Sequence, residues 1–135
     1  MLTHGLYLID TCICIALLKK DPKVIKRLYE IGVSECKISN ITLAELYFGA
    51  YKSGQQKHFD DVKEIACLFE SYPISHLKKY GEIRWQLEQI GMKIGDMDTF
   101  IAATALEEDL ILVTGNTEHF SRIPGLKIEN WIESK

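Results

Sequence analysis

Hydrophobic positions gather into short runs that alternate with longer stretches of helical spacing. Residues 6–9 form an uninterrupted apolar run that ends at Asp10, and residues 110–114 contain a second such run. A run of this length is typical of a strand that is buried on both faces of a parallel sheet. Weaker segments predict further strands, the last of them at a sheet edge, over 37–39, 72–74 and 126–131.

Between these strands the apolar residues recur every three or four positions, which predicts amphipathic helices. One of them begins at Asp21-Pro22, where Asp is a good N-cap and Pro suits the first helical position. The others are expected over 11–18, 41–50, 57–69, 77–90, from Asp96 or Asp98 to 108, and over 117–122. Strands that alternate with helices predict an α/β fold with a mainly parallel sheet.

Composition narrows the class of protein. With 135 residues, of which 47% are hydrophobic and 26% charged, the chain is expected to form a single domain over 1–135. No apolar stretch is long enough to span a membrane, and the N-terminus lacks the pattern of a secretory signal, so the cytoplasm is expected. The four cysteines lack the C-x-x-C spacing of zinc or redox sites and are expected to be reduced and mostly buried. They are Cys12, Cys14, Cys36 and Cys67.

The charge balance restricts how the chain can bind nucleic acid. Sixteen Lys and Arg stand against nineteen Asp and Glu, for a net charge of −3. Binding to nucleic acid would therefore need a local basic patch. Two clusters of basic residues are candidates, although solvated helix faces also look like this. They are Lys19, Lys20, Lys23, Lys26 and Arg27, and Lys78, Lys79, Arg84 and Lys93.

Three carboxylates lie in unusually apolar surroundings: Asp10, Glu45 and Asp98, none of which has a Lys or Arg within four residues. A buried carboxylate is costly unless it is paired or binds a metal. Each has a structural alternative: Asp98 suits a helix cap, Glu45 an exposed helix position, and Asp10 a distant ion pair or a backbone contact. Together, at the carboxyl ends of strands where such sheets bind ligands, they predict an all-oxygen site for Mg²⁺ or Mn²⁺.

An ion in such a site lowers the pKa of bound water and neutralises charge on a phosphate, so metal-assisted phosphodiester hydrolysis is the natural reaction class. Nucleotide-binding G-x-x-x-x-G-K-[ST] and G-x-G-x-x-G loops are absent, as is a G-x-S-x-G elbow. A phosphatase with Asp10 as nucleophile is a weaker alternative, because the second Asp of a D-x-D pattern is missing.

Four segments together resemble the PIN-domain ribonucleases of the VapC type, the toxins of VapBC toxin–antitoxin pairs. The segments are 7–13, 38–50, 94–103, and 112–120 with its continuation over 123–131. Their order and spacing agree from end to end, so the resemblance covers nearly the whole chain. It implies a three-layer α/β/α sandwich around a mainly parallel sheet of about four or five strands.

The resemblance also implies an activity and a set of site residues. VapC-type proteins are Mg²⁺- or Mn²⁺-dependent endoribonucleases that cleave structured RNA, often tRNA. The first three family acids fall on Asp10, Glu45 and Asp98, which would be the catalytic and metal-binding residues. Asp98 fits the family's G-x-x-D spacing from Gly95, whereas Asp96 is left with an open role as an extra ligand, a supporting acid or a cap.

The fourth acidic position of the family departs from the pattern, because Asn116 stands there. Its amide oxygen remains a candidate metal ligand, and Glu118 and His119 are candidates to reach the metal instead. Thr11 is a candidate supporting residue that would hydrogen-bond a carboxylate. The missing acid keeps a second hypothesis open, a non-catalytic PIN-like module that only binds a partner.

Partners follow from the same resemblance. It implies a VapB-type antitoxin whose tail crosses the toxin, a homodimer, and DNA binding only through the antitoxin. Residues 41–48 carry more apolar surface than one core-facing stripe needs, which fits either an interface helix or a helix buried in the core.

Overall fold

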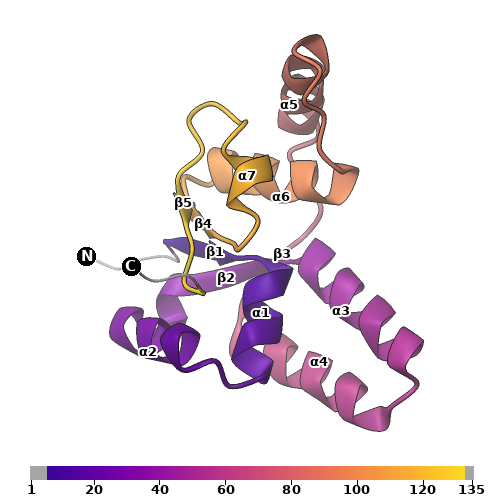
Figure 1. Cartoon of the computed structure of the whole chain (residues 1–135), viewed down its shortest axis with the longest axis vertical. Helices are drawn as coiled ribbons and strands as arrows, with labels where there is room; N and C mark the ends of the chain where they lie inside the picture. The colour runs from indigo at the N-terminus through magenta and orange to yellow at the C-terminus, as the bar shows by residue number, and fades with distance from the viewer. Residues whose placement is uncertain (1–5, 133–135) are drawn as a thin grey trace.

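A computed structural model describes residues 6–132, which form a five-stranded parallel sheet in the order β3-β2-β1-β4-β5 (Figure 1). The two apolar runs lie at its centre, where β1 pairs with β4 in the register Tyr7↔Ile111 to Ile9↔Val113. The strands are β1 (Tyr7–Ile9), β2 (Cys36–Ser39), β3 (Glu70–Tyr72), β4 (Ile111–Val113) and β5 (Ile128–Glu129). Because β1 and β4 are parallel and in register, the residues that follow them meet at one edge of the sheet.

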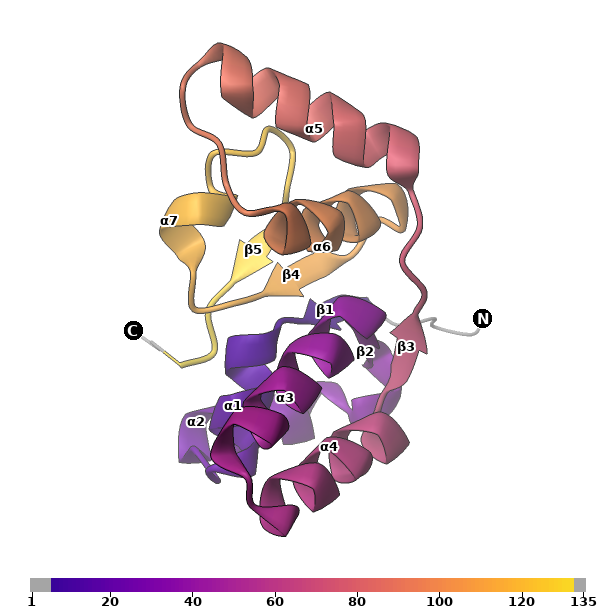
Figure 2. The ribbon, with the colours of Figure 1, turned by 90° about the vertical axis from the view of Figure 1, so that its right-hand side faces the viewer.

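Helices cover both faces of this sheet, so the predicted α/β/α sandwich is confirmed (Figure 2). One face carries α1 (Thr11–Leu18), α2 (Pro22–Ile31), α3 (Asn40–Ser53) and α4 (Gln56–Leu68). The other carries α5 (Leu77–Gln89), α6 (Asp96–Glu107) and the short α7 (Thr117–Phe120). A short 3-10 turn at Val33–Glu35 precedes β2.

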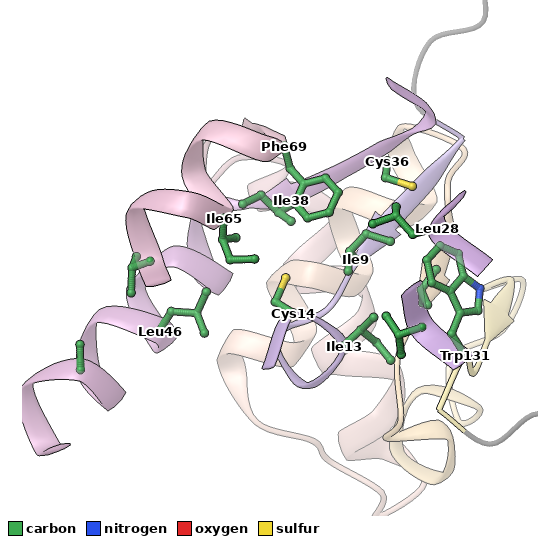
Figure 3. Packing of buried hydrophobic residues seen from close by; sticks show 14 residues of the cluster. Ile9, Ile13, Cys14, Leu28, Cys36, Ile38, Leu46, Ile65, Phe69 and Trp131 are labelled. Carbon is green, nitrogen blue, oxygen red and sulfur yellow. The ribbon is translucent and has the colours of Figure 1, made fainter. Parts of the chain in front are cut away.

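Each face has its own hydrophobic core, because successive residues of a strand point to opposite sides. Ile9 packs with Ile13 of α1 and with Trp131 in the first core (Figure 3). Leu8 belongs to the second core, against α5 and α6. The continuous apolar run over 6–9 is thus explained by burial on both faces.

Local sequence signals set several helix ends. Asp21 caps α2 by accepting hydrogen bonds from the amides of Lys23 and Val24 at 2.9 and 3.3 Å. Ser39 caps α3 through the amide of Ile41 at 3.0 Å. The same helix ends at Gly54, whose φ of 68° is the left-handed conformation that glycine adopts without strain.

The structure corrects some boundaries. The strand predicted over 72–74 lies at Glu70–Tyr72 instead, because Pro73 has no amide hydrogen to continue the ladder. The last strand is reduced to Ile128–Glu129. Burial was also overestimated for Cys67, which is exposed, whereas Cys14 and Cys36 are buried, Cys12 is half-buried, and all four are free thiols.

Two predictions about surfaces have clear outcomes. None of the helices within residues 6–132 is long and apolar enough to cross a membrane. The apolar surplus near 41–48 is partly on the surface, since Tyr47, Phe48 and the following Tyr51 of α3 are exposed.

Candidate active site

Asp10 forms the centre of the candidate site, at the point where β1 ends and α1 begins. Its side chain is only 6% exposed. One carboxylate oxygen accepts the amide hydrogen of Thr11 at 2.8 Å and thereby caps α1. The other accepts the hydroxyl hydrogen of Thr114 at 2.8 Å. Both oxygens are thus held in fixed directions.

Glu45 is directed to the same edge by threonines of α1 and α3. The Thr11 hydroxyl donates a hydrogen bond to Glu45 Oε1. The same hydroxyl lies 3.2 Å from the hydroxyl of the buried Thr42, one turn before Glu45 on α3. Thr11 therefore connects two predicted site acids, because its amide contacts Asp10 while its side chain contacts Glu45.

Asp98 completes an electrostatically coupled group of three acids. It lies in the first turn of α6 and is half-buried. Burial raises the pKa of its carboxyl, and the negative charge of Glu45 raises that pKa further. Burial also raises the pKa of Asp10, against its hydrogen bonds from Thr114 and Thr11, and the charge of Asp98 adds to the increase. The fold therefore brings Asp98 of α6 close enough to repel both Asp10 at the end of β1 and Glu45 of α3.

Asp96, the other acid of the α6 start, is directed towards α5. Its carboxylate accepts a hydrogen bond from the Tyr80 hydroxyl at 2.8 Å and lies 3.5 Å from the Arg84 guanidinium. Tyr80 also stacks on Phe100 of α6, with the ring centroids 4.2 Å apart. These contacts use Asp96 to join α5 to α6, and they separate its role in the fold from that of Asp98.

Of the three candidates for the fourth acidic position of the family, Asn116 and His119 lie near Asp98, whereas Glu118 is exposed. The Asn116 amide group lies 2.9 Å from His119 Nδ1, and the His119 ring lowers the pKa of Asp98. Asn116 and His119 therefore belong to the neighbourhood of Asp98. Glu118 has a side chain that is 87% exposed and lies 3.6 Å from the Arg122 guanidinium.

Sequence reasoning missed Thr114, Thr42 and Cys12 as members of the site. Thr114 is fully buried, and its hydroxyl also accepts the amide hydrogen of Asn116 at 3.0 Å. The sequence did contain a signal for Thr114. This polar residue ends the second apolar run as Asp10 ends the first, and the parallel pairing of β1 with β4 sets Thr114 beside Asp10. Cys12 and Thr42 carry no such signal, because a thiol and a helical threonine are ordinary core residues.

The chemistry of the site suits a hard divalent cation. Asp10, Glu45 and Asp98 form no ion pair with Lys or Arg anywhere in the part of the chain that the structure describes. Within the same residues, no three His, Cys, Asp or Glu side chains stand close enough together to enclose a metal on their own. Mg²⁺ takes one or two protein carboxylates and keeps several waters, so the oxygen donors present fit it.

A groove of about 350 Å³ opens beside the acids, between α1, α3 and α4. Its floor is mostly apolar, with Ile15, Leu46 and Val62 among the lining residues. Glu45 lies on its wall, and Lys19, Lys57, His58 and Asp61 add polar groups. The groove thus connects the acidic site with an apolar surface that an extended peptide or helix would fill.

Comparisons with known proteins show similarity over nearly the whole chain. Residues 7–126 match the family model of the PIN domain. The chain is 35% identical over 130 residues to Ribonuclease VapC2 of Haemophilus influenzae, covering 93% of this chain and 98% of that protein. It is 34% identical over 128 residues to the tRNA(fMet)-specific endonuclease VapC of Salmonella typhimurium, covering 93% and 97%.

Solved structures show the same fold. The crystal structure of VapBC2 from Rickettsia felis bound to a promoter DNA fragment matches with a TM-score of 0.84 at 35% identity, covering 93% of this chain and 98% of that one. DNA-bound VapBC from Salmonella typhimurium matches with a TM-score of 0.85 at 32% identity, covering 97% and 99%. Both likenesses therefore span nearly the whole chain.

Proposed function

The chain belongs to the PIN-domain family, as its four sequence segments predicted, and from this premise we propose that it is an endoribonuclease toxin of the VapC type. The observation that carries the proposal is the meeting of Asp10, Glu45 and Asp98 at the carboxyl edge of the sheet without a basic partner among the described residues. Carboxylates that repel one another in a half-buried site need a cation to compensate them.

That cation would be Mg²⁺ or Mn²⁺, with oxygen donors drawn from Asp10, Glu45 and Asp98, the amide oxygen of Asn116 and water. When bound, it neutralises charge on the scissile phosphate and makes water a stronger nucleophile. Thr114 and the Thr11 amide keep the Asp10 oxygens in place for it. The Thr11 hydroxyl does the same for Glu45.

Asp98 is the candidate general base. Without a cation, burial and the charge of Glu45 raise the pKa of its carboxyl. It is more exposed than Asp10 and keeps an open approach from solvent. In this role Asp98 would take a proton from the attacking water, and His119 lies beside Asp98.

The substrate proposed is a structured RNA, with tRNA as the first candidate. Two relatives are named tRNA(fMet)-specific endonucleases, from Salmonella typhimurium and Shigella flexneri. A site on the rim of a sheet admits a loop that protrudes from a folded RNA, whereas a deep pocket would not.

A VapB-type antitoxin is the proposed partner, because the solved relatives are VapBC complexes. The groove between α1, α3 and α4 suits its tail, since a peptide laid on the apolar floor would reach Glu45 on the wall. The exposed aromatic residues of α3 suit a homodimer contact, and DNA binding in such a complex belongs to the antitoxin.

The test is cleavage of a tRNA pool by purified, antitoxin-free protein with Mn²⁺, with Mg²⁺ and with EDTA. Discrete products should require the metal and disappear in Asp10→Asn and Asp98→Asn. Asp96→Asn is the matched control, because it removes an acid from the same helix turn that contacts Tyr80 instead of the site. Cleavage that survives both site substitutions would refute the assignment.

One alternative rests on a specific observation. Asn116 replaces a family acid and contacts His119, which reduces the negative charge of the site. A PIN-like module that binds a partner without cutting RNA is the alternative function. It predicts no cleavage of any RNA by folded protein, and no gain of activity when Asn116→Asp restores the acid.

A further inference from the structure

The corner formed by the end of α1 and the first turns of α2 carries most of the positive charge near the site. Residues 19–30 hold five cations, Lys19, Lys20, Lys23, Lys26 and Arg27, against two acids, Asp21 and Glu30. This is a net charge of +3 over twelve residues of a chain whose total is −3, so the remainder of the chain sums to −6. We call residues 19–30 the basic corner.

Most of this charge is not neutralised. No carboxylate pairs with Lys19, Lys20, Lys23 or Lys26 within residues 6–132. The Asp21 carboxylate is occupied as the cap of α2. Only Arg27 has acidic neighbours, with Glu30 at 3.8 Å and Glu129 at 3.4 Å. The lysines are therefore available to a ligand.

The turn between α1 and α2 concentrates these lysines. Lys20 adopts a left-handed conformation with φ at 61°, and its amide donates to the Leu17 carbonyl at 3.0 Å. The next amide, of Asp21, donates to the Ala16 carbonyl, also at 3.0 Å. This tight turn sets the end of α1 directly against the start of α2, so the lysines of the turn and those of α2 are close along the chain.

The start of α2 lies near the C-terminal segment that passes beside the loop after β4. Cys12 Sγ lies 3.8 Å from Asp10 Oδ2 and accepts the amide hydrogen of Gly115 at 3.2 Å. A Cβ atom placed on Gly115 would lie 3.5 Å from the side chain of Ile132. The Lys23 ammonium donates to the Ile132 carbonyl at 3.2 Å. Gly115 and Ile132 therefore lie between Asp10 and Lys23.

A cleft and an exposed aromatic residue complete this surface. A cleft of about 400 Å³ lies between α2 and residues 129–131. Its lining includes Lys23, Lys26 and Arg27, together with the two acids that pair with Arg27. Tyr29, three residues after Lys26 on α2, is 87% exposed. Basic residues with an exposed aromatic ring are the combination that binds unpaired nucleotides, through phosphate contacts and base stacking.

Two of the four members of the second basic cluster found in the sequence are paired with acids. On α5, Lys79 pairs with Glu82 at 2.6 Å, and Arg84 pairs with Glu88 at 2.8 Å and with Asp96 at 3.5 Å. Its charge serves contacts within α5 and between α5 and α6. Both views place α5 away from α2, on the opposite face of the sheet (Figures 1 and 2).

We propose that the basic corner is the RNA-backbone site of this protein, where Lys20, Lys23 and Lys26 bind phosphates of the strand that enters the acidic site and Tyr29 stacks on one of its bases. This inference rests on the proposed ribonuclease function for its substrate. Three negatively charged acids repel the RNA backbone, so binding of the strand requires a separate cationic surface.

The experiment measures binding of fluorescently labelled tRNA by anisotropy over a range of salt concentrations, in EDTA so that the RNA stays intact. The test variant is Lys20→Gln with Lys26→Gln, and the matched control is Lys63→Gln with Lys78→Gln. Each pair removes two positive charges from exposed positions, but the control pair lies on α4 and α5. Within residues 6–132, neither pair removes an ion pair or a buried side chain, so folding should be unaffected.

Each phosphate contact to a single strand contributes about 0.7 to the slope of log K against log salt. Loss of two contacts should therefore lower the slope by about 1.4 and weaken binding about 25-fold at about 0.1 M salt. The control pair should keep the wild-type slope. Tyr29→Ala should weaken binding about tenfold and leave the slope unchanged, because stacking releases no counterions.

Several results would overturn the inference: equal slopes for the test and control pairs, or no RNA binding by the wild-type protein. The outcome is separable from that of the cleavage assay. Cleavage with unchanged binding in the test pair would refute the basic corner alone, whereas binding that depends on the corner without any cleavage would refute the catalytic proposal alone. In an active protein, the test pair should raise KM and leave kcat unchanged.

Discussion

Thr114→Val is the sharpest test of how the fold holds Asp10. The substitution keeps the shape of a fully buried side chain but removes its hydroxyl. Two hydrogen bonds are lost: the donation to Asp10 Oδ2 at 2.8 Å and the acceptance from the Asn116 amide at 3.0 Å. The remaining neighbour of Asp10 Oδ2 is the Cys12 thiol at 3.8 Å, which is a weak donor.

The expected cost follows from these two bonds. A hydrogen bond to a charged group contributes about 1.5–3 kcal/mol, and a neutral one about 0.5–1.5 kcal/mol, so Thr114→Val should destabilise the metal-free protein by about 2–4 kcal/mol. With an unfolding entropy of about 2.1 cal/mol/K per residue, that free energy lowers Tm by about 7–14 °C for 135 residues.

The measurement is urea denaturation and calorimetry, with Thr104→Val as the control. Thr104 is also buried, but its hydroxyl donates to the Phe100 carbonyl, which the helix already uses. Its loss should therefore cost less than about 1 kcal/mol. The reasoning would be refuted if the two variants were equally destabilised, or if Thr114→Val cost as much in an Asp10→Asn background as in the wild-type protein.

Other predictions concern the acids and the core. Burial raises the pKa of Asp10, so the folded protein binds a proton there more tightly than the unfolded chain, and stability from this group is gained as the pH falls through its folded pKa. At neutral pH without metal, Asp10→Asn should therefore unfold at a higher urea concentration than the wild type. The difference between their urea midpoints should shrink as the pH is lowered. A difference that stays constant or grows would contradict this reasoning. Thr11→Val should reduce the cleavage rate by more than its change in Tm explains, because Glu45 loses the hydrogen bond from the Thr11 hydroxyl. A loss of cleavage that only follows the loss of stability would indicate a purely structural role. Leu112→Ala, at a fully buried position of β4, should cost about 2–5 kcal/mol by denaturation and leave the RNA-binding slope of the folded fraction unchanged.

Periodicity predicted the fold well where the pattern was local. The buried strands at 6–9 and 110–114 and the capped helix at Asp21 appear as predicted, because apolar runs and capping residues act over a few positions. The third strand was predicted at 72–74, two residues too late, because Tyr72 and Ile74 are residues typical of strands. The missing amide hydrogen of Pro73 ends the strand at Tyr72.

The acidic site was predicted only in part, for a physical reason. Apolar neighbours marked Asp10, Glu45 and Asp98 as unusual, since an isolated carboxylate is costly in such surroundings. The different directions of Asp96 and Asp98, two residues apart, could not be deduced from the chain. They depend on Tyr80 and Arg84 of a helix that packs alongside and supplies the hydrogen bonds to Asp96.

The sequence by itself determined the alternation of strands and helices, the family, and the acids that have no local partner. The tertiary structure alone decided that Thr11 and Thr114 orient those acids, that Glu118 turns to Arg122, and that two members of the second basic cluster pair with acids. Hydrophobic residues that repeat every 2 positions in a strand or every 3.6 positions in a helix encode which side of the element is buried. The approach of side chains that are distant in the sequence depends instead on how the helices pack on the sheet.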